Sequence, residues 1–232
     1  MASIWGKAKE GGKTHLALTF PEPIYYINLD QGMQELLKNF LDKQIFEVRV
    51  HAETSLLVNS LDDFLSNEYK EMMAAYREAL EALRKIEAGT IIFDTFTQAR
   101  SLITHYWLSK IRKERVASGG RDETFQYDYE DANNDTGGII RDVYDVPGVN
   151  LVLVHRAAPV YDNKGNDLGT VKIQGWHGVA PAVGHILYTG RNAKGEFYAK
   201  IEGSRSGSEF MGMTIENPTY DKLIALGLGA VE

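Results

Sequence analysis

The residues best suited to chemistry are Gly11-Gly12-Lys13-Thr14, which stand between a short apolar segment, Ser3-Ile4-Trp5, and a helical run over 15–20. A strand, a glycine loop, Lys-Thr and a helix in this order surround nucleotide phosphates with backbone N–H groups and the positive end of a helix. In such a loop Lys13 would reach the outer phosphates and the Thr14 hydroxyl would hold Mg²⁺. The pattern indicates a protein that hydrolyses or senses a nucleotide.

The loop departs from the usual spacing, which places a glycine six positions before the lysine, where this chain has Lys7. Gly6 stands one step further out, so the loop carries an extra residue. Short Gly-Lys-Thr strings also arise by chance, and the alternative is a glycine-rich helix N-terminus with an exposed lysine. We assign six residues to the predicted nucleotide site: Gly6, Gly11, Gly12, Lys13, Thr14 and His15.

A second motif is the apolar run Ile91-Ile92-Phe93 that ends in Asp94, well downstream of the Lys-Thr pair. A strand that ends in aspartate is typical of the Walker B element, whose carboxylate binds Mg²⁺ through water, opposite Thr14. Alternatively, the aspartate caps the next helix together with Thr95 or Thr97. The glycine loop favours the metal interpretation, so Thr14 and Asp94 are the predicted metal residues.

Composition limits the class of protein. The chain has 232 residues, 44% hydrophobic and 25% charged, which fits a single α/β domain over 1–232 with a large core. It has no cysteine, which excludes disulfides and thiolate metal sites, and we expect a cytoplasmic protein with no structural zinc. Neither a membrane-spanning apolar run nor a signal peptide pattern is apparent.

Charge is unevenly distributed around a net value of −7. Six basic residues and one acid lie over 100–121, and six acids with no base lie over 122–135. This reversal suits head-to-tail subunit contacts or a bound polyanion; the alternative is a solvated helix face followed by a polar loop.

The remaining pattern positions these motifs. Strands are expected at 24–29, 46–51, 90–95 and 149–155, with helices at 33–41, 61–86 (possibly broken near Asn67), 96–116 and 139–145. Hairpin turns are expected at 163–166 and 192–195, among short strands, with a last helix at 220–228. Alternation followed by hairpins predicts an α/β fold: a mostly parallel sheet flanked by helices, with a C-terminal antiparallel extension and the ligand at the carboxyl ends of the strands.

Order and spacing resemble the RecA-like branch of phosphate-loop ATPases, and more narrowly the compact phage-encoded RecA-like proteins linked to single-strand annealing and recombination. The marks of this resemblance cover nearly the whole chain: Gly11-Gly12-Lys13-Thr14, Ile27-Asn28-Leu29-Asp30, Ile91-Ile92-Phe93-Asp94, Leu153-Val154-His155-Arg156 and 200–205. The resemblance implies ATP and Mg²⁺ as cofactors, and adenine as the base.

The resemblance also implies catalytic roles. An acidic residue after the second strand activates water in RecA-like enzymes, and Asp30 occupies that place where glutamate is usual; the alternative is a turn-forming aspartate. His155 stands where a polar residue senses the γ-phosphate, although such a histidine can simply be a hydrogen-bonded residue ending a strand. Lys200 or Arg205 would reach the neighbouring subunit's γ-phosphate, as an arginine finger does, unless it pairs within its own chain.

DNA binding is implied for 157–184, where RecA-like proteins carry a mobile DNA-binding loop. Charge and a stacking surface would come from Lys164, Lys172, Trp176 and His177, although an ordinary surface hairpin explains them equally well. The resulting hypothesis is a homo-oligomeric ATPase, ring or filament, that binds single-stranded DNA and no membrane. It would promote annealing or strand pairing, together with a single-strand DNA-binding protein. Alternatives are a switch or scaffold that hydrolyses little, and a DNA-translocating motor.

Overall fold

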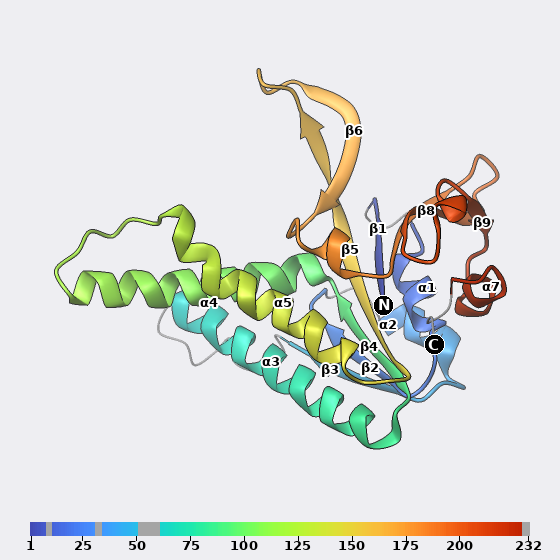
Figure 1. Ribbon diagram of the computed structural model, residues 1–232, viewed down its shortest axis with the longest axis horizontal. Coiled ribbons are helices and arrows are strands. Elements are labelled where there is room, and N and C mark those ends of the chain that lie inside the picture. The colour runs from blue at the N-terminus through green and yellow to red at the C-terminus, as the bar shows by residue number, and fades with distance from the viewer. Residues whose placement is uncertain (8–10, 31–33, 51–60, 229–232) are drawn as a thin grey trace.

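The computed structural model describes residues 1–7, 11–30, 34–50 and 61–228 (Figure 1). Within these residues one sheet of nine strands forms the centre of the molecule, in the order β3-β2-β4-β5-β1-β7-β8-β9, with β6 paired to β5. The strands are β1 (Ala2–Gly6), β2 (Ile24–Asn28), β3 (Ile45–Arg49), β4 (Gly89–Asp94), β5 (Val149–Tyr161), β6 (Asp167–Gln174), β7 (His185–Arg191), β8 (Phe197–Ser204) and β9 (Thr214–Glu216).

The first part of the sheet is parallel and the last part is antiparallel. Strands β3, β2, β4, β5, β1 and β7 pair in parallel, then β8 pairs antiparallel with β7 and β9 pairs antiparallel with β8. This arrangement confirms the predicted α/β class, with a mostly parallel sheet and an antiparallel C-terminal extension. Parallel strands place their carboxyl ends at one edge, so the ends of β1, β2 and β4 lie together.

Helices cover both faces of the sheet. On one face lie α3 (Leu61–Ile86), α4 (Phe96–Ala117) and α5 (Glu130–Tyr144), and on the other lie α1 (Lys13–Leu18) and α7 (Tyr220–Ala225). Each face has its own apolar cluster, and neighbouring residues of one strand enter opposite clusters: Phe93 packs under α3 and α4, and Ile92 packs under α1. This alternation with period 2 is why β4 reads as a continuous apolar run.

Shorter helical elements complete the chain: α2 (Gln34–Leu37) with η1 (Lys38–Phe40), η3 (Gln126–Tyr129), α6 (Val179–Ala182) and η4 (Ser208–Phe210). Helix α3 is continuous over 26 residues, so the suggested break near Asn67 is wrong. None of the described helices is both long and apolar enough to cross a bilayer.

Helix α5 begins nine residues before the start expected at 139, and residues 130–138 that sequence reasoning placed in a loop are helical. Acidic side chains in the first turn, Glu130 and Asp131, suit the positive end of the helix. A Cβ at Gly137 would lie 3.0 Å from the Arg141 guanidinium and 3.5 Å from the Trp176 ring, so the ring lies beside this part of the helix.

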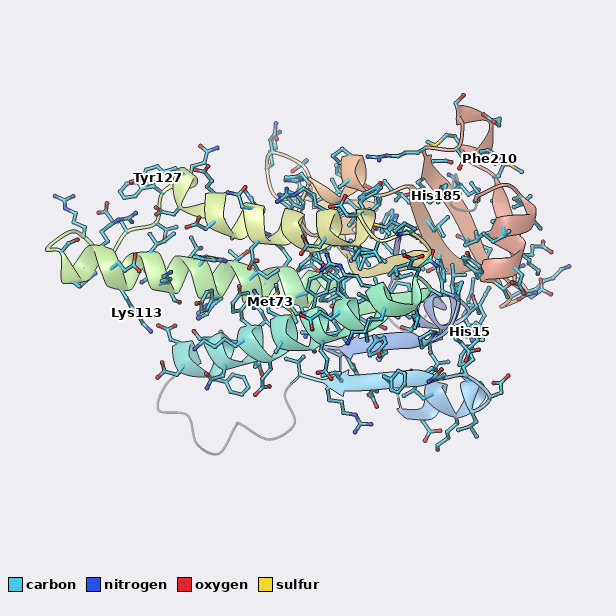
Figure 2. The ribbon with its side chains drawn as sticks, turned by 60° about the horizontal axis from the view of Figure 1, so that its bottom comes forward. His15, Met73, Lys113, Tyr127, His185 and Phe210 are labelled. Carbon is cyan, nitrogen blue, oxygen red and sulfur yellow. The ribbon has the colours of Figure 1, made fainter. Side chains whose placement is uncertain are left out.

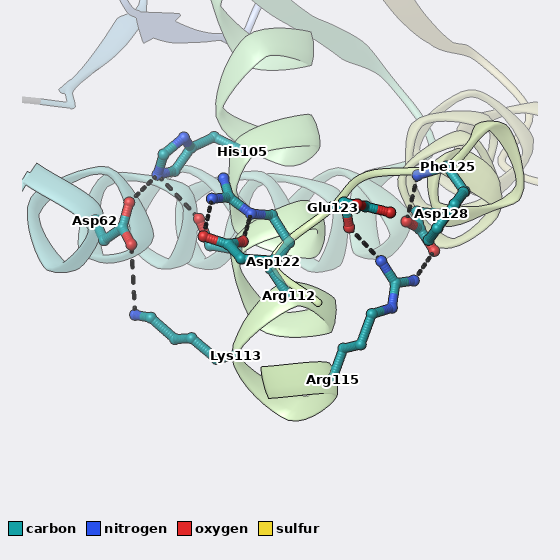
Figure 3. A network of polar contacts seen from close by, with 10 residues as sticks. Asp62, His105, Arg112, Lys113, Arg115, Asp122, Glu123, Phe125 and Asp128 are labelled. Carbon is teal, nitrogen blue, oxygen red and sulfur yellow. Dashed lines mark hydrogen bonds and ion pairs between the residues drawn. The ribbon is translucent and has the colours of Figure 1, made fainter. Parts of the chain in front are cut away.

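The basic and acidic blocks pair with each other within the chain (Figure 3). Arg112 binds Asp122 at 2.5 Å, and Arg115 binds Asp128 at 2.6 Å and donates to the Glu123 carbonyl. These ion pairs hold the segment that follows α4 against that helix. Two arginines of the basic block are thus paired within the chain, and a role of the two blocks toward a polyanion or a neighbouring subunit stays a prediction.

Candidate functional site

The described glycines of the predicted phosphate loop stand where a side chain would collide with β7 or β8. A Cβ on Gly6 would lie 2.4 Å from the Thr189 carbonyl oxygen, and one on Gly11 would lie 2.8 Å from the Thr189 hydroxyl. Gly12 has φ +62°, and its Cβ would lie 2.7 Å from the Phe197 ring. The chain therefore approaches its neighbours closely at these three glycines, which leave backbone rather than side chains at their positions.

Lys13 begins α1 and folds back over the loop. Its Nζ donates to the carbonyl oxygens of Lys7, at 2.8 Å, and Gly6, at 3.2 Å. Burial lowers the pKa of this amine, the carboxylates of Asp94 and Asp30 act in the opposite direction, and Arg156 lowers it further. The ammonium of Lys13 is thus held against backbone carbonyls of the loop, within electrostatic range of both predicted catalytic carboxylates.

Thr14 and Asp94 meet at the carboxyl end of β4. The Thr14 hydroxyl donates to Asp94 Oδ2 at 2.6 Å, and the Tyr26 hydroxyl donates to the same oxygen at 2.9 Å. Burial raises the pKa of Asp94, and the two hydroxyl donors oppose that rise. The predicted metal pair is therefore assembled in three dimensions from residues 80 positions apart. The sequence did not identify Tyr26 as a site residue, because a tyrosine within an apolar strand is typical of the hydrophobic core.

Asp30 follows β2 at the same edge and pairs with a residue that received no role from the sequence. Arg156 donates to Asp30 Oδ2 at 3.2 Å, and both side chains are about half exposed. The Asp30 backbone N–H donates to Asn28 Oδ1 at 3.0 Å, which fixes the turn after the strand. An arginine thus holds the predicted water-activating carboxylate beside Lys13. In the sequence, the signal that could have indicated a role for Arg156 is its position directly after His155.

His155 points away from this group. Its side chain is fully buried on the face covered by α4, with its ring 5.5 Å from the Phe96 ring. Burial lowers its pKa to about 4, so the imidazole is neutral at pH 7. In this arrangement Arg156, and not His155, faces the phosphate loop. The sensing role of His155 stays a prediction.

We expect His155 to make the protein sensitive to acid. The unfolded chain takes up a proton near pH 6.5 and the folded protein only near pH 4, so the free energy of unfolding falls by about 3 kcal/mol as pH drops through this window. Denaturant titrations between pH 7.5 and 4 should show that His155→Leu removes this loss. The exposed His177→Leu serves as control, and identical pH slopes for the wild type and His155→Leu would contradict the assignment.

An aromatic and cationic wall stands beside Gly12, and sequence reasoning did not find it. The Arg191 guanidinium lies 4.1 Å from the centre of the Phe197 ring, and the His15 ring lies parallel to Phe197 at 6.4 Å. His15 also contacts Phe40, at 5.1 Å between ring centres. The strands β7 and β8 supply this wall, so the C-terminal extension of the sheet takes part in the site. Aromatic faces of this kind stack on nucleobases.

The predicted DNA-binding residues lie on and beside the hairpin of β5 and β6, which projects from the sheet (Figure 1). Lys164 stands in its turn, where Asp162 accepts N–H bonds from Lys164 and Asn166, and Lys172 is exposed on β6. His177 is exposed after β6. Trp176 is half-buried against α5, so Tyr161, which is 57% exposed, offers the more open ring on the hairpin.

One hydroxyl joins the base of this hairpin to the segment after Asp94. The Thr97 hydroxyl accepts from the backbone N–H of Arg156 at 3.0 Å and donates to the backbone carbonyl of Gln174 at 2.8 Å. Arg156 and Gln174 are paired across β5 and β6. Thr95 caps α4 through a bond from the Gln98 N–H. The start of α4 thus contacts both hairpin strands directly.

The two predicted arginine-finger candidates lie on and after β8, and Arg205 is apart from the phosphate loop of its own chain. Lys200 is exposed on β8, opposite Tyr188 of β7. The Arg205 N–H donates to the Gly184 carbonyl, just before β7, which places it at the amino edge of the parallel strands. Its guanidinium donates to the Tyr144 hydroxyl at 2.9 Å and to the Pro181 carbonyl. Arg205 also lines a cavity of about 620 Å³ at this edge, with His185 and Leu223.

The residues at the carboxyl edge fit a nucleoside triphosphate with Mg²⁺. The loop leaves no room for side chains at its glycines, and beside it stand an ammonium, a hydroxyl and a buried carboxylate, which are the donor and ligand types that phosphates and Mg²⁺ require. When bound, Mg²⁺ would neutralise charge on the phosphate oxygens. Fold and site together define a phosphate-loop nucleotide-binding protein.

Comparison with known families agrees with this class. Residues 1–187 match the family model described as an AAA domain, so the chain belongs to that family of P-loop ATPase-type proteins. Membership indicates nucleotide-binding ATPase activity, for which Mg²⁺ is the typical metal. No curated protein matches the chain. The matched residues end within β7, so Arg191 and Phe197 lie beyond them.

Proposed function

We propose that this protein is an oligomeric, RecA-like ATPase that binds single-stranded DNA and uses ATP to control annealing or strand pairing. Lys13 would bind the outer phosphates, Thr14 and Asp94 would hold Mg²⁺, and Asp30 would accept a proton from the attacking water. The wall formed by Arg191 and Phe197 would bind the base, adenine in this proposal. A phage origin and a single-strand DNA-binding protein as partner belong to the same proposal.

The observation that carries the proposal is the path from the nucleotide site to the hairpin. Arg156 contacts Asp30 through its side chain, and its backbone N–H donates to Thr97. Thr97 in turn donates to the other hairpin strand at Gln174. A change in the charges around Asp30 would therefore act directly on the first residue of the hairpin pairing. Such a connection suits a protein whose polymer binding depends on its nucleotide.

Assembly follows from the same proposal. Arg205 lies at the amino edge of the parallel strands, so a γ-phosphate contact by Arg205 would come from a neighbouring subunit arranged head-to-tail, and Lys200 is the other candidate for such a contact. Arg205 would first have to leave Tyr144 and the Pro181 carbonyl. Lys200 is exposed and would need no such release.

The direct experiment measures Mg²⁺-dependent ATP hydrolysis with and without single-stranded DNA. Stimulation by DNA supports the coupled ATPase. Stimulation together with strand unwinding would instead support a motor. Binding of ATP without turnover, in either condition, would contradict the enzyme and favour the switch or scaffold.

We expect the hairpin lysines to contribute to DNA affinity. Replacing Lys164 and Lys172 with Glu should lower affinity for a labelled oligonucleotide and make its salt dependence shallower, because fewer counterions are released. Fluorescence anisotropy at several salt concentrations measures both. The matched control is Lys113→Glu, whose lysine lies at the far end of the helical layer (Figure 2). Equal loss in the control would place the DNA elsewhere.

The switch or scaffold remains the second candidate because of the Asp30–Arg156 pair. Arg156 engages Asp30 Oδ2, which is then not free to contact water, and aspartate has a shorter side chain than the glutamate usual in RecA-like enzymes. Slow turnover would follow from both features. A turnover rate that DNA does not change would favour this candidate.

A further inference from the structure

We propose that Tyr26 is a positioning residue for the metal site: its hydroxyl fixes the Asp94 carboxylate so that one defined oxygen is presented to Mg²⁺. The inference rests on the nucleotide-binding part of the proposed function and adds a residue that no motif assigns. Tyr26 lies in the middle of β2, next to β4, and its side chain is fully buried among apolar residues.

The geometry at the carboxylate carries the proposal. Asp94 Oδ2 accepts from Tyr26 at 2.9 Å and from Thr14 at 2.6 Å. Two hydroxyl donors satisfy the two lone pairs of Oδ2, so the role toward the metal falls to Oδ1. The hydroxyl proton of Thr14 points at Asp94, which leaves the lone pairs of Thr14 Oγ1 free for Mg²⁺. Tyr26 thereby helps to set the orientation of both predicted metal residues.

The packing makes this orientation rigid. Tyr26 pairs with Ile92 across the strands, two residues before Asp94, so the length of a tyrosine brings its hydroxyl to the carboxylate. The ring is held under α1 in the cluster that contains Ile92 and Leu18. Asp94 itself is only 4% exposed. A carboxylate held in place before the metal arrives loses less conformational freedom on binding.

Tyr26→Phe tests the proposal because it keeps the ring and removes one donor. Electron paramagnetic resonance with Mn²⁺ as the probe, in saturating ADP, measures metal binding without turnover. We expect the dissociation constant for Mn²⁺ to rise about tenfold, in keeping with the loss of one hydrogen bond to a charged group. Affinity for ADP in the presence of EDTA should stay at the wild-type value, since Tyr26 does not face the phosphates.

Tyr76→Phe is the matched control. Tyr76 is equally buried, and its hydroxyl donates to the Ile139 carbonyl at 2.9 Å on the opposite face of the sheet. Both variants should lower the unfolding temperature, and only Tyr26→Phe should weaken Mn²⁺ binding. Equal Mn²⁺ affinity in both variants would overturn the positioning role. A wild-type protein that binds neither ADP nor Mn²⁺ would overturn the nucleotide assignment as well, so the two failures are distinguishable.

Discussion

Lys13→Ala should abolish most Mg²⁺-dependent ATP turnover, with a loss of about 10²–10³-fold. The lysine is the cation at the mouth of the loop, and removing one charge stabiliser from a transition state costs this much in comparable sites. Burial already lowers the pKa of Lys13, which shows that the protein holds this amine in a partly dehydrated place where its charge acts strongly on phosphate oxygens. Steady-state ATPase assays at saturating Mg²⁺ measure the effect.

The matched control is Lys43→Ala. The Lys43 ammonium also donates to a backbone carbonyl, that of Phe20, at 2.9 Å, but it precedes β3 and so stands at the opposite edge of the parallel strands. This variant should retain wild-type turnover. If Lys13→Ala hydrolyses ATP as fast as Lys43→Ala, the measured activity does not arise at the glycine loop, and the site described here is not the catalytic one.

Much of this site could be predicted from the sequence because its parts follow strands. Gly11 to Thr14 and Asp94 sit at the ends of β1 and β4, and parallel strands bring such ends together regardless of the distance along the chain. The hairpins were also predictable, since the turns at 163–166 and 192–195 carry glycine in the left-handed region at Gly165 and Gly195.

The features that could not be predicted depend on which face of the sheet a side chain occupies and on packing between elements that are distant in the sequence. Whether His155 or Arg156 faces the loop is decided by the register of β5, and a shift of one residue exchanges them. Helix α5 begins at Glu130 and includes Gly137 and Gly138, two residues that local propensity places in a loop. The pairing of Arg112 and Arg115 with Asp122 and Asp128 depends on how the chain turns after α4, which the charge pattern alone does not reveal.

Asp30→Asn should lower kcat by about 10²–10⁴-fold while ATP binding is retained. Asparagine has the shape of aspartate and can still accept from Arg156, but it cannot take a proton from water, and general base catalysis contributes a factor of this size. Rapid-quench measurement of a single turnover separates the chemical step from product release. Asp42→Asn, an exposed acid before β3 at the opposite edge, is the control and should be unchanged.

Arg156→Gln tests whether the ion pair with Arg156 limits the action of Asp30 as a general base. The guanidinium occupies Asp30 Oδ2 at 3.2 Å, so that oxygen is engaged by Arg156 rather than free to contact the attacking water. If the pair restrains the enzyme until DNA binds, Arg156→Gln should raise basal turnover and reduce the stimulation by DNA. The double variant with Asp30→Asn should behave as Asp30→Asn alone, because the arginine acts through the carboxylate. Additive effects would mean that Arg156 contacts the nucleotide independently of Asp30.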